Sequence, residues 1–323
     1  MQNLGTLGNQ FTILALIMND FDRDFYTARD NQNNIHRIIV VKNNRNNNDN
    51  FPANEINILN ILHNINNPHV LHYIGNGNGQ LSLNNQQPIN VNYLIFEHAP
   101  RIDLLSPRLQ MAFTETQAKL IFKKILSGIQ AIHNANICHR DIKPDNIFCD
   151  ENHNLKIFGF EICCLNANNL EEFAGDRDYV APEIFEQHPY NGIISDIFSL
   201  GKLLFCLVTG RIAFRAPNIN EPPYSFIGNH QFNNFWAFYP NLNLSDNFKN
   251  LFVRMIAYNP NERPSIEQIL NDVWMQEINN LNNDQIHNLE EQVILELHNR
   301  QDAIINLNNA QPQPINNANN GQP

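Results

Sequence analysis

The chain lacks any apolar run long enough to cross a bilayer. A membrane-spanning helix needs about 20 apolar residues in succession, whereas the longest apolar runs here, 13–18 and 200–208, are much shorter. The N-terminus also lacks the basic stretch that opens a secretory signal. The sequence therefore predicts neither a membrane span nor a signal peptide.

Cysteine is scarce, and its spacing carries no metal-site pattern. None of the five cysteines forms a Cys-x-x-Cys pair, which argues against both a zinc site and a disulfide framework. A reduced, intracellular (cytoplasmic) compartment is the corresponding expectation. We interpret all five as small buried apolar side chains: Cys138, Cys149, Cys163, Cys164 and Cys206.

Positive charge is also in short supply. The sequence has 21 Lys and Arg against 32 Asp and Glu, a formal net charge of −11. Nucleic acids and anionic membrane surfaces are bound mainly through Lys and Arg. Neither is therefore an expected partner, and the acidic balance is also what simple solubility requires.

The chain does contain enough apolar residues, 42% of 323, for a large core and two lobes. The first third favours strands at 11–18, 35–42, 70–74 and 92–96, with a helix at 54–65. Asparagine-rich stretches at 43–50, 64–67, 76–92 and 306–320 predict surface loops, including 75–90 between two strands, and a disordered end. The remainder is helical, with segments at 114–134, 195–209, 244–257 and 265–278. The first of these begins with a capping box, Thr114-Glu-Thr-Gln117. The pattern indicates an α+β fold.

The last segment has helical spacing over 281–307, followed by a stretch, 308–323, that we expect to be disordered. Its apolar positions are Ile286, Leu289, Val293, Leu297 and Ile304. Such a helix packs on the domain, dimerises, or stays a marginal free helix. Packing on the domain is the simplest of the three.

Residues 139–146 read His-Arg-Asp-Ile-Lys-Pro-Asp-Asn, and this string resembles the catalytic loop of eukaryotic protein kinases. The resemblance extends in order over 11–280. It implies a β-rich N-lobe at 11–97 and a helical C-lobe at 101–280, with an extension at 1–10 and a tail at 281–323. In that family the aspartate, here Asp141, receives or positions the substrate hydroxyl. Lys143 matches the serine/threonine type, and Asn146 matches a metal ligand.

Other family positions also have counterparts. Lys42, ending Ile39-Val-Val-Lys42, resembles the phosphate-binding lysine, and Glu55 resembles the glutamate that pairs with it. Phe96-Glu97-His98-Ala99 resembles the hinge, with Phe96 as gatekeeper, the Ala99 backbone facing adenine, and Asp103 on the ribose side. These residues would hold ATP with magnesium. The architectural counterparts are Glu183 with Arg263, Asp196, and the column formed by Leu59, Tyr73, His139 and Phe160.

Several departures from the family pattern occur at positions that would bind the nucleotide and the metal ion. Gly159 stands where the family has its second metal-binding aspartate, and Met18, Asp20 and Arg23 stand where it has phosphate-loop glycines. Glu161, two residues beyond Gly159, is an alternative but unfavourable metal ligand. The adenine pocket is overfilled by larger side chains than the family usually has: Phe25, Val40 and Phe148.

The activation segment departs as well. No Ser or Thr lies between Gly159 and Glu183, so phosphorylation of a serine or threonine there is excluded. Asp176 replaces a threonine, and it would repel Asp141 or capture Lys143. Glu171 and Glu172 either mimic a phosphate toward Arg140 or form a solvated acidic loop.

The architectural residues match the family, whereas several residues that would bind nucleotide and metal do not. This contrast permits three interpretations. The first is a pseudokinase, an interaction or allosteric module with no cofactor and a protein partner such as an active kinase or a signalling complex. The second is a serine/threonine kinase with weak or unconventional ATP-dependent activity. The third is a sensor that binds nucleotide without turnover.

Overall fold

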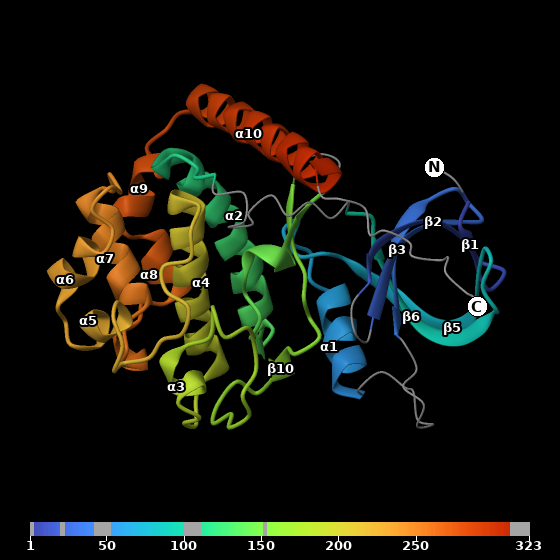
Figure 1. Cartoon of the computed structure of the whole chain (residues 1–323), viewed down its shortest axis with the longest axis horizontal. Coiled ribbons are helices and arrows are strands. Elements are labelled where there is room, and N and C mark those ends of the chain that lie inside the picture. The colour runs from blue at the N-terminus through green and yellow to red at the C-terminus, as the bar shows by residue number, and fades with distance from the viewer. Residues whose placement is uncertain (1–2, 20–22, 42–52, 100–110, 151–153, 311–323) are drawn as a thin grey trace, which may run out of the picture.

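The structure is a computed structural model that describes residues 3–19, 23–41, 53–99, 111–150 and 154–310. Figure 1 shows a strand-rich lobe and a larger helical lobe, with helix α1 (Ala53–His63) between the barrel strands and the helical lobe. The two-lobed α+β expectation is thus confirmed. Lys42, Asp20 and Asp103 lie outside the described residues, so the roles expected of them stay predictions.

The small lobe is a closed barrel of antiparallel strands in the order β1-β2-β3-β4-β6-β5. The strands are β1 (Gly5–Leu7), β2 (Phe11–Asn19), β3 (Arg23–Asp30), β4 (Ile35–Val41), β5 (Tyr73–Leu83) and β6 (Ile89–Glu97). The short β1 lies in the segment expected as an extension. It pairs with both β2 and β5, and so closes the sheet.

The loop expected at 75–90 is wrong, because β5 and β6 extend through most of it as a long hairpin. Asparagine and glycine content suggested a loop. The glycines instead accommodate an aromatic ring, since a side chain at Gly77 would overlap the ring of Tyr93 on the paired strand. Glycine in a strand interior often marks such a close approach.

The register of β4 corrects a second expectation. Ile39 pairs with Phe25 and belongs to the cluster that contains Phe96, whereas Val40 belongs to the cluster inside the barrel. Successive side chains of a strand point to opposite faces. Ile39, not Val40, therefore lies beside Phe25 at the adenine position.

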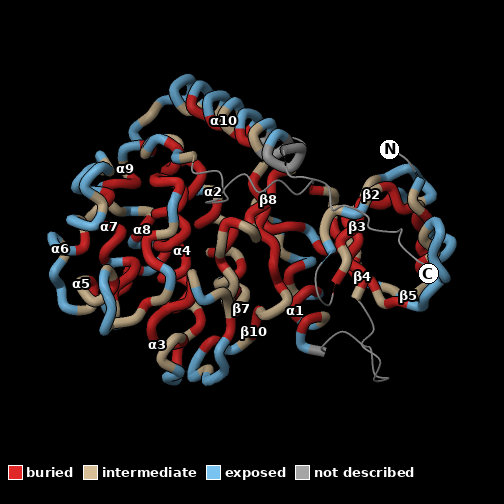
Figure 2. Tube along the Cα trace, in the orientation of Figure 1, coloured by how far each residue is buried: buried red, intermediate tan, exposed pale blue. Residues whose placement is uncertain are grey.

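The large lobe is built around buried helices (Figure 2). Helix α2 (Glu115–Asn134) begins at the predicted capping box, in which Thr114 and Gln117 cap each other. The other elements of this lobe and of the C-terminal segment are β7 (Ile137–Cys138), β8 (Ile147–Cys149), β9 (Leu155–Ile157), β10 (Cys164–Leu165), α3 (Pro182–Phe185), α4 (Gly192–Thr209), α5 (Tyr224–Gly228), α6 (Phe232–Ala237), α7 (Asp246–Met255), α8 (Ile266–Leu270), α9 (Val273–Asn279) and α10 (Asn283–Ala310).

Helix α4 is the one described helix that is long and apolar enough to cross a membrane by composition alone. However, 89% of it is buried inside the protein. It packs against α2 and α7 as the core helix of the large lobe. Burial in the protein core accounts for its apolar character.

Helix α10 lies across α2 (Figure 1), which agrees with packing of the tail on the domain. Leu289, Val293 and Leu297 are buried beneath it. Near its end the buried Arg300 donates to the Met111 carbonyl oxygen at 2.8 Å, and its guanidinium lies 3.6 Å from the Phe113 ring centroid. The helix is therefore anchored between Leu289 and Arg300.

Candidate functional site

The catalytic loop is held by one buried carboxylate on α4. Asp196 accepts hydrogen bonds from the backbone amides of His139 and Arg140, each at 2.8 Å, and contacts His133 Nε2 at 2.8 Å. Arg140 has a positive φ of 64°, an unfavourable conformation that these contacts support. The structure thus places Asp196 in its expected architectural role.

Asp141, Lys143 and Asn146 come together beyond this support. Lys143 Nζ lies 3.1 Å from Asp141 Oδ2 and 3.7 Å from Asp176 Oδ2, so the capture of Lys143 by Asp176 is observed. Burial acts to lower the pKa of Lys143, but the Asp141 and Asp176 carboxylates outweigh it and raise that pKa. The lysine is therefore held in its charged form between two carboxylates.

Asn146 is turned toward Asp141. Its amide donates to both the backbone oxygen and Oδ2 of Asp141, each at 2.7 Å. The Asn146 carboxamide also occupies the space where a side chain on Gly159 would begin, and Gly159 has a φ of +89°. The place of the missing metal-binding aspartate is thus filled by the other ligand of the motif.

Glu55 on α1 has a partner that the sequence did not suggest. Arg23, on β3 at the position of a phosphate-loop glycine, donates to both oxygens of Glu55 at 2.7 and 2.9 Å. Arg23 also lies 4.0 Å from Glu161. Burial raises the pKa of Glu161, although the nearby Arg23 opposes this effect. One arginine thus links the barrel, α1 and the start of the activation segment.

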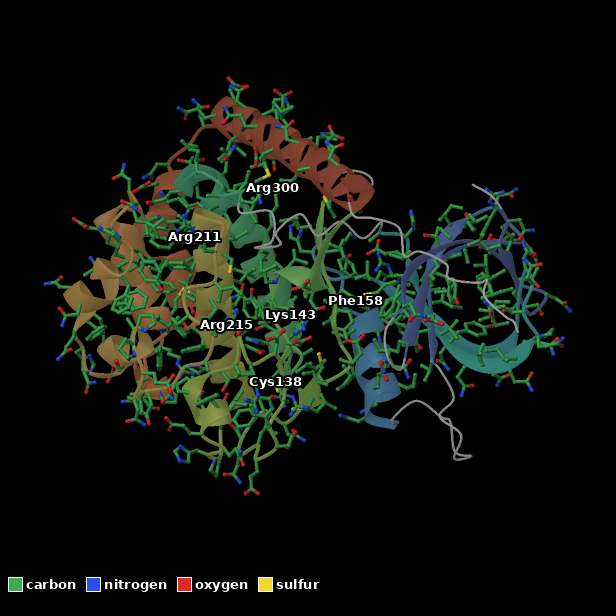
Figure 3. All side chains as sticks on the ribbon, in the orientation of Figure 1. Cys138, Lys143, Phe158, Arg211, Arg215 and Arg300 are labelled. Atoms are coloured by element: carbon green, nitrogen blue, oxygen red, sulfur yellow. The ribbon has the colours of Figure 1, made fainter. Side chains whose placement is uncertain are left out.

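Aromatic rings gather at the adenine position around Phe158, which is labelled in Figure 3. The ring centroid of Phe158 lies 5.0 Å from that of Phe148, stacked, and 5.6 and 6.1 Å from those of Phe96 and Phe25, edge to face. All four are buried. The overfilling expected from Phe25 and Phe148 is therefore completed by Phe158, which sequence reasoning missed.

Arg37 on β4 is the second residue that sequence reasoning missed. It is 0% exposed, its guanidinium carbon lies 4.3 Å from the Phe148 ring centroid, and it donates a hydrogen bond to the Ala99 carbonyl oxygen. Charged side chains are rarely buried without partners. An arginine within the apolar strand 35–42 was the available signal.

Another hinge residue, Glu97, contacts both β9 of the large lobe and the segment just before β5. Its carboxylate accepts from Lys156 Nζ at 2.8 Å and from the His72 backbone amide at 2.9 Å. Its own backbone amide donates to the His72 carbonyl oxygen at 3.0 Å. These contacts fix the position of the hinge relative to β9.

The architectural pairs of the large lobe are in place. Arg263 and Glu183 form two hydrogen bonds of 2.7 Å in a buried site. The ring of His139 lies 5.8 Å from Phe160, edge to face, and the other members of the column, Leu59 and Tyr73, are buried. The structure therefore contains both these architectural contacts and the supported catalytic loop described above.

The family model described as protein kinase domain matches residues 25–275. The chain belongs to the protein kinase family. It is 32% identical over 187 residues to CBL-interacting serine/threonine-protein kinase 15 of Arabidopsis thaliana, covering 56% of this chain and 43% of that protein. It is 34% identical over 190 residues to sperm motility kinase Z of Mus musculus, covering 57% of this chain and 36% of that protein. The match spans less than half the length of each relative.

This protein kinase domain has an activation segment held by an acidic side chain. Arg140 donates to Glu172 and, at 2.7 Å, to the Ile162 carbonyl oxygen, while Tyr190 donates to the Glu172 carbonyl oxygen at 3.0 Å. The Arg140 hydrogen bond lowers the pKa of Glu172. Glu172 pairs with Arg140, as in the first alternative for this loop, and its side chain is also 59% exposed, as in the second, so the structure does not separate the two.

The described residues do not fit magnesium–ATP in the usual manner of a protein kinase. Gly159 supplies no metal ligand, and the amide of Asn146 donates to Asp141. The hinge carbonyl of Ala99 accepts from Arg37.

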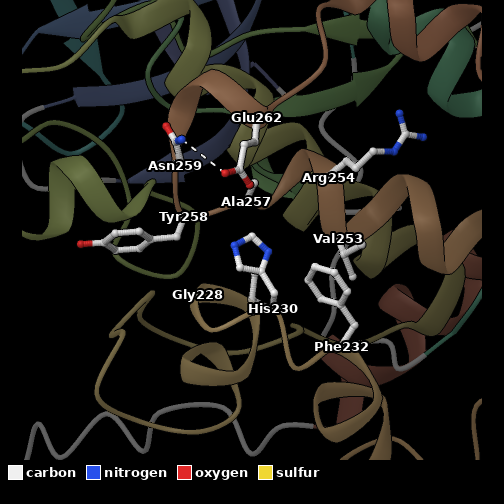
Figure 4. A pocket seen from close by; sticks show the side chains of 10 residues that line it. Gly228, His230, Phe232, Val253, Arg254, Ala257, Tyr258, Asn259 and Glu262 are labelled. Carbon is white, nitrogen blue, oxygen red and sulfur yellow. Dashed lines mark hydrogen bonds between the residues drawn. The ribbon is translucent and has the colours of Figure 1, made fainter.

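A separate hollow lies in the large lobe, between the α5–α6 segment and α7 (Figure 4). It has a volume of about 120 Å³ and is lined by apolar groups, among them Phe232 and Val253, and by polar side chains that include His230, Asn259 and Glu262. None of the residues expected to bind nucleotide lines it.

Proposed function

We propose that this protein kinase domain acts as a pseudokinase, an interaction or allosteric module that performs little or no phosphoryl transfer. The observation that carries the proposal is Arg37. Its guanidinium is planar, lies over Phe148 and donates to the hinge carbonyl of Ala99. Both contacts set a planar cation beside the hinge and the Phe148 ring, where the family resemblance expects adenine, and they support a closed nucleotide position.

The phosphate and metal side supports the same proposal. Phosphoryl transfer depends mainly on positioning and charge neutralisation by metal ions and lysine. Here Gly159 offers no carboxylate, and Glu55 is engaged by Arg23. Losing a metal ligand of this kind costs on the order of 3 kcal/mol of transition-state stabilisation, about a hundredfold in rate.

We propose that the partner is a protein, because the net charge of −11 disfavours binding to nucleic acid and to anionic membranes. The proposed location of this interaction is inside the cell. The Arabidopsis thaliana relative is a serine/threonine-protein kinase by name, and an active kinase or a signalling complex is the kind of partner we propose. The ordered activation segment, held by Glu172 without phosphorylation, supports a constant binding surface.

The test is a thermal-shift titration with ATP, with and without Mg²⁺, on the original chain and on Arg37→Ala. A ligand at about 100 times its Kd adds about 2.7 kcal/mol to the free energy of unfolding. We expect no shift for the original chain at millimolar ATP, and a shift for Arg37→Ala if the guanidinium is what excludes adenine.

Arg29→Ala is the matched control, because Arg29 is an exposed arginine on the adjacent strand β3. It should behave as the original chain. A Mg²⁺-dependent shift of the original chain would contradict the proposal.

A second candidate, a weak serine/threonine kinase, rests on one observation. Asp141, Lys143 and Asn146 remain within hydrogen-bonding distance of one another. This candidate predicts radiolabel transfer from ATP that disappears in Asp141→Asn. Absence of any label above that variant would eliminate it. Binding of nucleotide without transfer would instead identify the third candidate, a nucleotide sensor.

A further inference from the structure

Two thiols meet between the catalytic loop and the activation segment. Cys138, on β7, and Cys164, on β10, are directly opposite in an antiparallel pair. Both are free, and their sulfur atoms lie 3.1 Å apart. Opposed residues of antiparallel strands have Cα separations of about 4.5–5.5 Å, within the range that disulfides span. The backbone is therefore already arranged for a bond between them.

The two thiols differ in access and in environment. Cys164 is 8% exposed, whereas Cys138 is 0% exposed. Contact with the Cys138 thiol and the nearby Arg140 guanidinium lower the pKa of Cys164, and thiolate character favours oxidation. The adjacent Cys163 is occupied elsewhere, because its thiol faces the His139 carbonyl oxygen at 3.4 Å. A small oxidant thus reaches Cys164 first, and Cys138 is the nearest sulfur to it.

We propose that Cys138 and Cys164 form an oxidative modification site, closed to a disulfide by hydrogen peroxide or a related small hydroperoxide. The Cys164 thiolate attacks one peroxide oxygen, the O–O bond breaks, and the departing hydroxide takes up the thiol proton as water. The Cys138 sulfur then attacks the resulting sulfenic acid, the S–O bond breaks, and its proton leaves with the hydroxide as a second water. The two sulfurs lose two electrons, which reduce the peroxide.

The bond has a structural consequence. It would tie the residue just before His139-Arg140-Asp141 to the activation segment, enclosing 139–163 in a covalent loop. Between Gly159 and Glu183 the chain has no Ser or Thr to phosphorylate. Oxidation of the two cysteines would fix this segment covalently without any serine or threonine hydroxyl. This proposal does not depend on whether ATP binds.

The experiment treats the full chain with hydrogen peroxide, blocks remaining thiols, and maps peptides by mass spectrometry without reduction. We expect one cross-link, between Cys138 and Cys164, that dithiothreitol reverses. Cys138→Ala and Cys164→Ala should each abolish it. Cys149→Ala, which removes another buried thiol, should retain it.

Peptide mapping of the original chain shows whether the Cys138–Cys164 disulfide forms, even if a variant fails to fold. A bridge to Cys163, or Cys164 trapped as sulfinic acid beside a free Cys138, would overturn the proposal. So would thiols that stay reduced in peroxide. The oxidised form should also melt about 3–6 °C higher and exchange amide hydrogens in 159–176 more slowly. If amide hydrogen exchange in 159–176 is the same before and after oxidation, the disulfide does not fix the activation segment.

Discussion

Single residues set this kinase domain apart from the usual family pattern, and Gly159 is a constrained one. Its φ of +89° is a conformation that residues with side chains rarely adopt, and the Asn146 carboxamide occupies the space beside it. The substitution is therefore more than a missing carboxylate, because its neighbour has moved into its place.

Restoring the aspartate alone should fail. Gly159→Asp must displace Asn146 and adopt an unfavourable φ, so we expect no gain of phosphoryl transfer and a loss of at least about 1 kcal/mol in the free energy of unfolding. Radiolabel transfer and urea denaturation measure the two effects. Gly75→Asp is the control, since nothing lies within 4 Å of a side chain there. Robust transfer by Gly159→Asp would contradict this explanation.

The pair of Arg23 and Glu55 makes a second residue-scale prediction. Arg23→Leu leaves Glu55, and Glu161 beyond it, without their cation, and breaking a buried pair in this way typically costs about 3–5 kcal/mol. Replacing both partners by leucine should recover much of that loss. Urea denaturation of the two single variants and the double variant gives the coupling energy. Strictly additive losses would show that the two side chains act independently.

Whole elements were predicted well where local signals were strong. The capping box of Thr114 and Gln117 located the start of α2, because its hydrogen bonds are made within one turn. The register of β4 could not be obtained in this way, since Ile38, Ile39, Val40 and Val41 are all apolar. A one-residue shift exchanges the two faces of a strand, and only the cross-strand partners determine it.

Helix α10 yields the element-scale prediction. Leu297 is 1% exposed and Leu295 is 62% exposed on the same helix. Leu297→Ala should lower the free energy of unfolding by about 2–5 kcal/mol, and Leu295→Ala should change it by less than about 0.5 kcal/mol. Chemical denaturation measures both. Equal effects would mean that α10 does not dock on α2 in solution.

The molecule as a whole combines groups whose pKa shifts act in different pH ranges. Burial lowers the pKa of His69 and of His139 below the ordinary value of about 6.5. Burial acts to raise the pKa of Glu183, but its Arg263 hydrogen bonds outweigh this and lower it. Glu161 is opposite, because burial raises its pKa.

These directions give a pH dependence. Below about pH 6.5 the unfolded chain binds more protons at both histidines than the folded chain, so the free energy of unfolding should fall from pH 7.5 to pH 5.5. Glu161, whose folded pKa is raised, takes up its proton above about pH 4.5 and partly opposes this fall. Below about pH 4.5 the Glu183 contribution is lost as well. Urea denaturation at each pH measures this, and His69→Gln should flatten the first interval. A constant value from pH 7.5 to pH 5.5 would contradict it.

The two-lobed fold and the grouping of Asp141, Lys143 and Asn146 were accessible from sequence because ordered motifs and their spacing define them. The contents of the adenine position were only partly accessible. Phe25 and Phe148 could be recognised by size, but Arg37 and Phe158 come from separate segments, and their meeting depends on how the lobes close. Long-range packing of this kind leaves no local signal.

The closed barrel of the small lobe has a consequence for a chain so rich in asparagine. Exposed strand edges are templates for edge-to-edge association, and asparagine-rich segments are prone to stack as cross-β ladders. The three residues of β1 pair with residues 11–13 of β2 and 81–83 of β5, and so close the described barrel. Pairing with β1 covers the backbone groups of those stretches, which are then no longer available for edge-to-edge association.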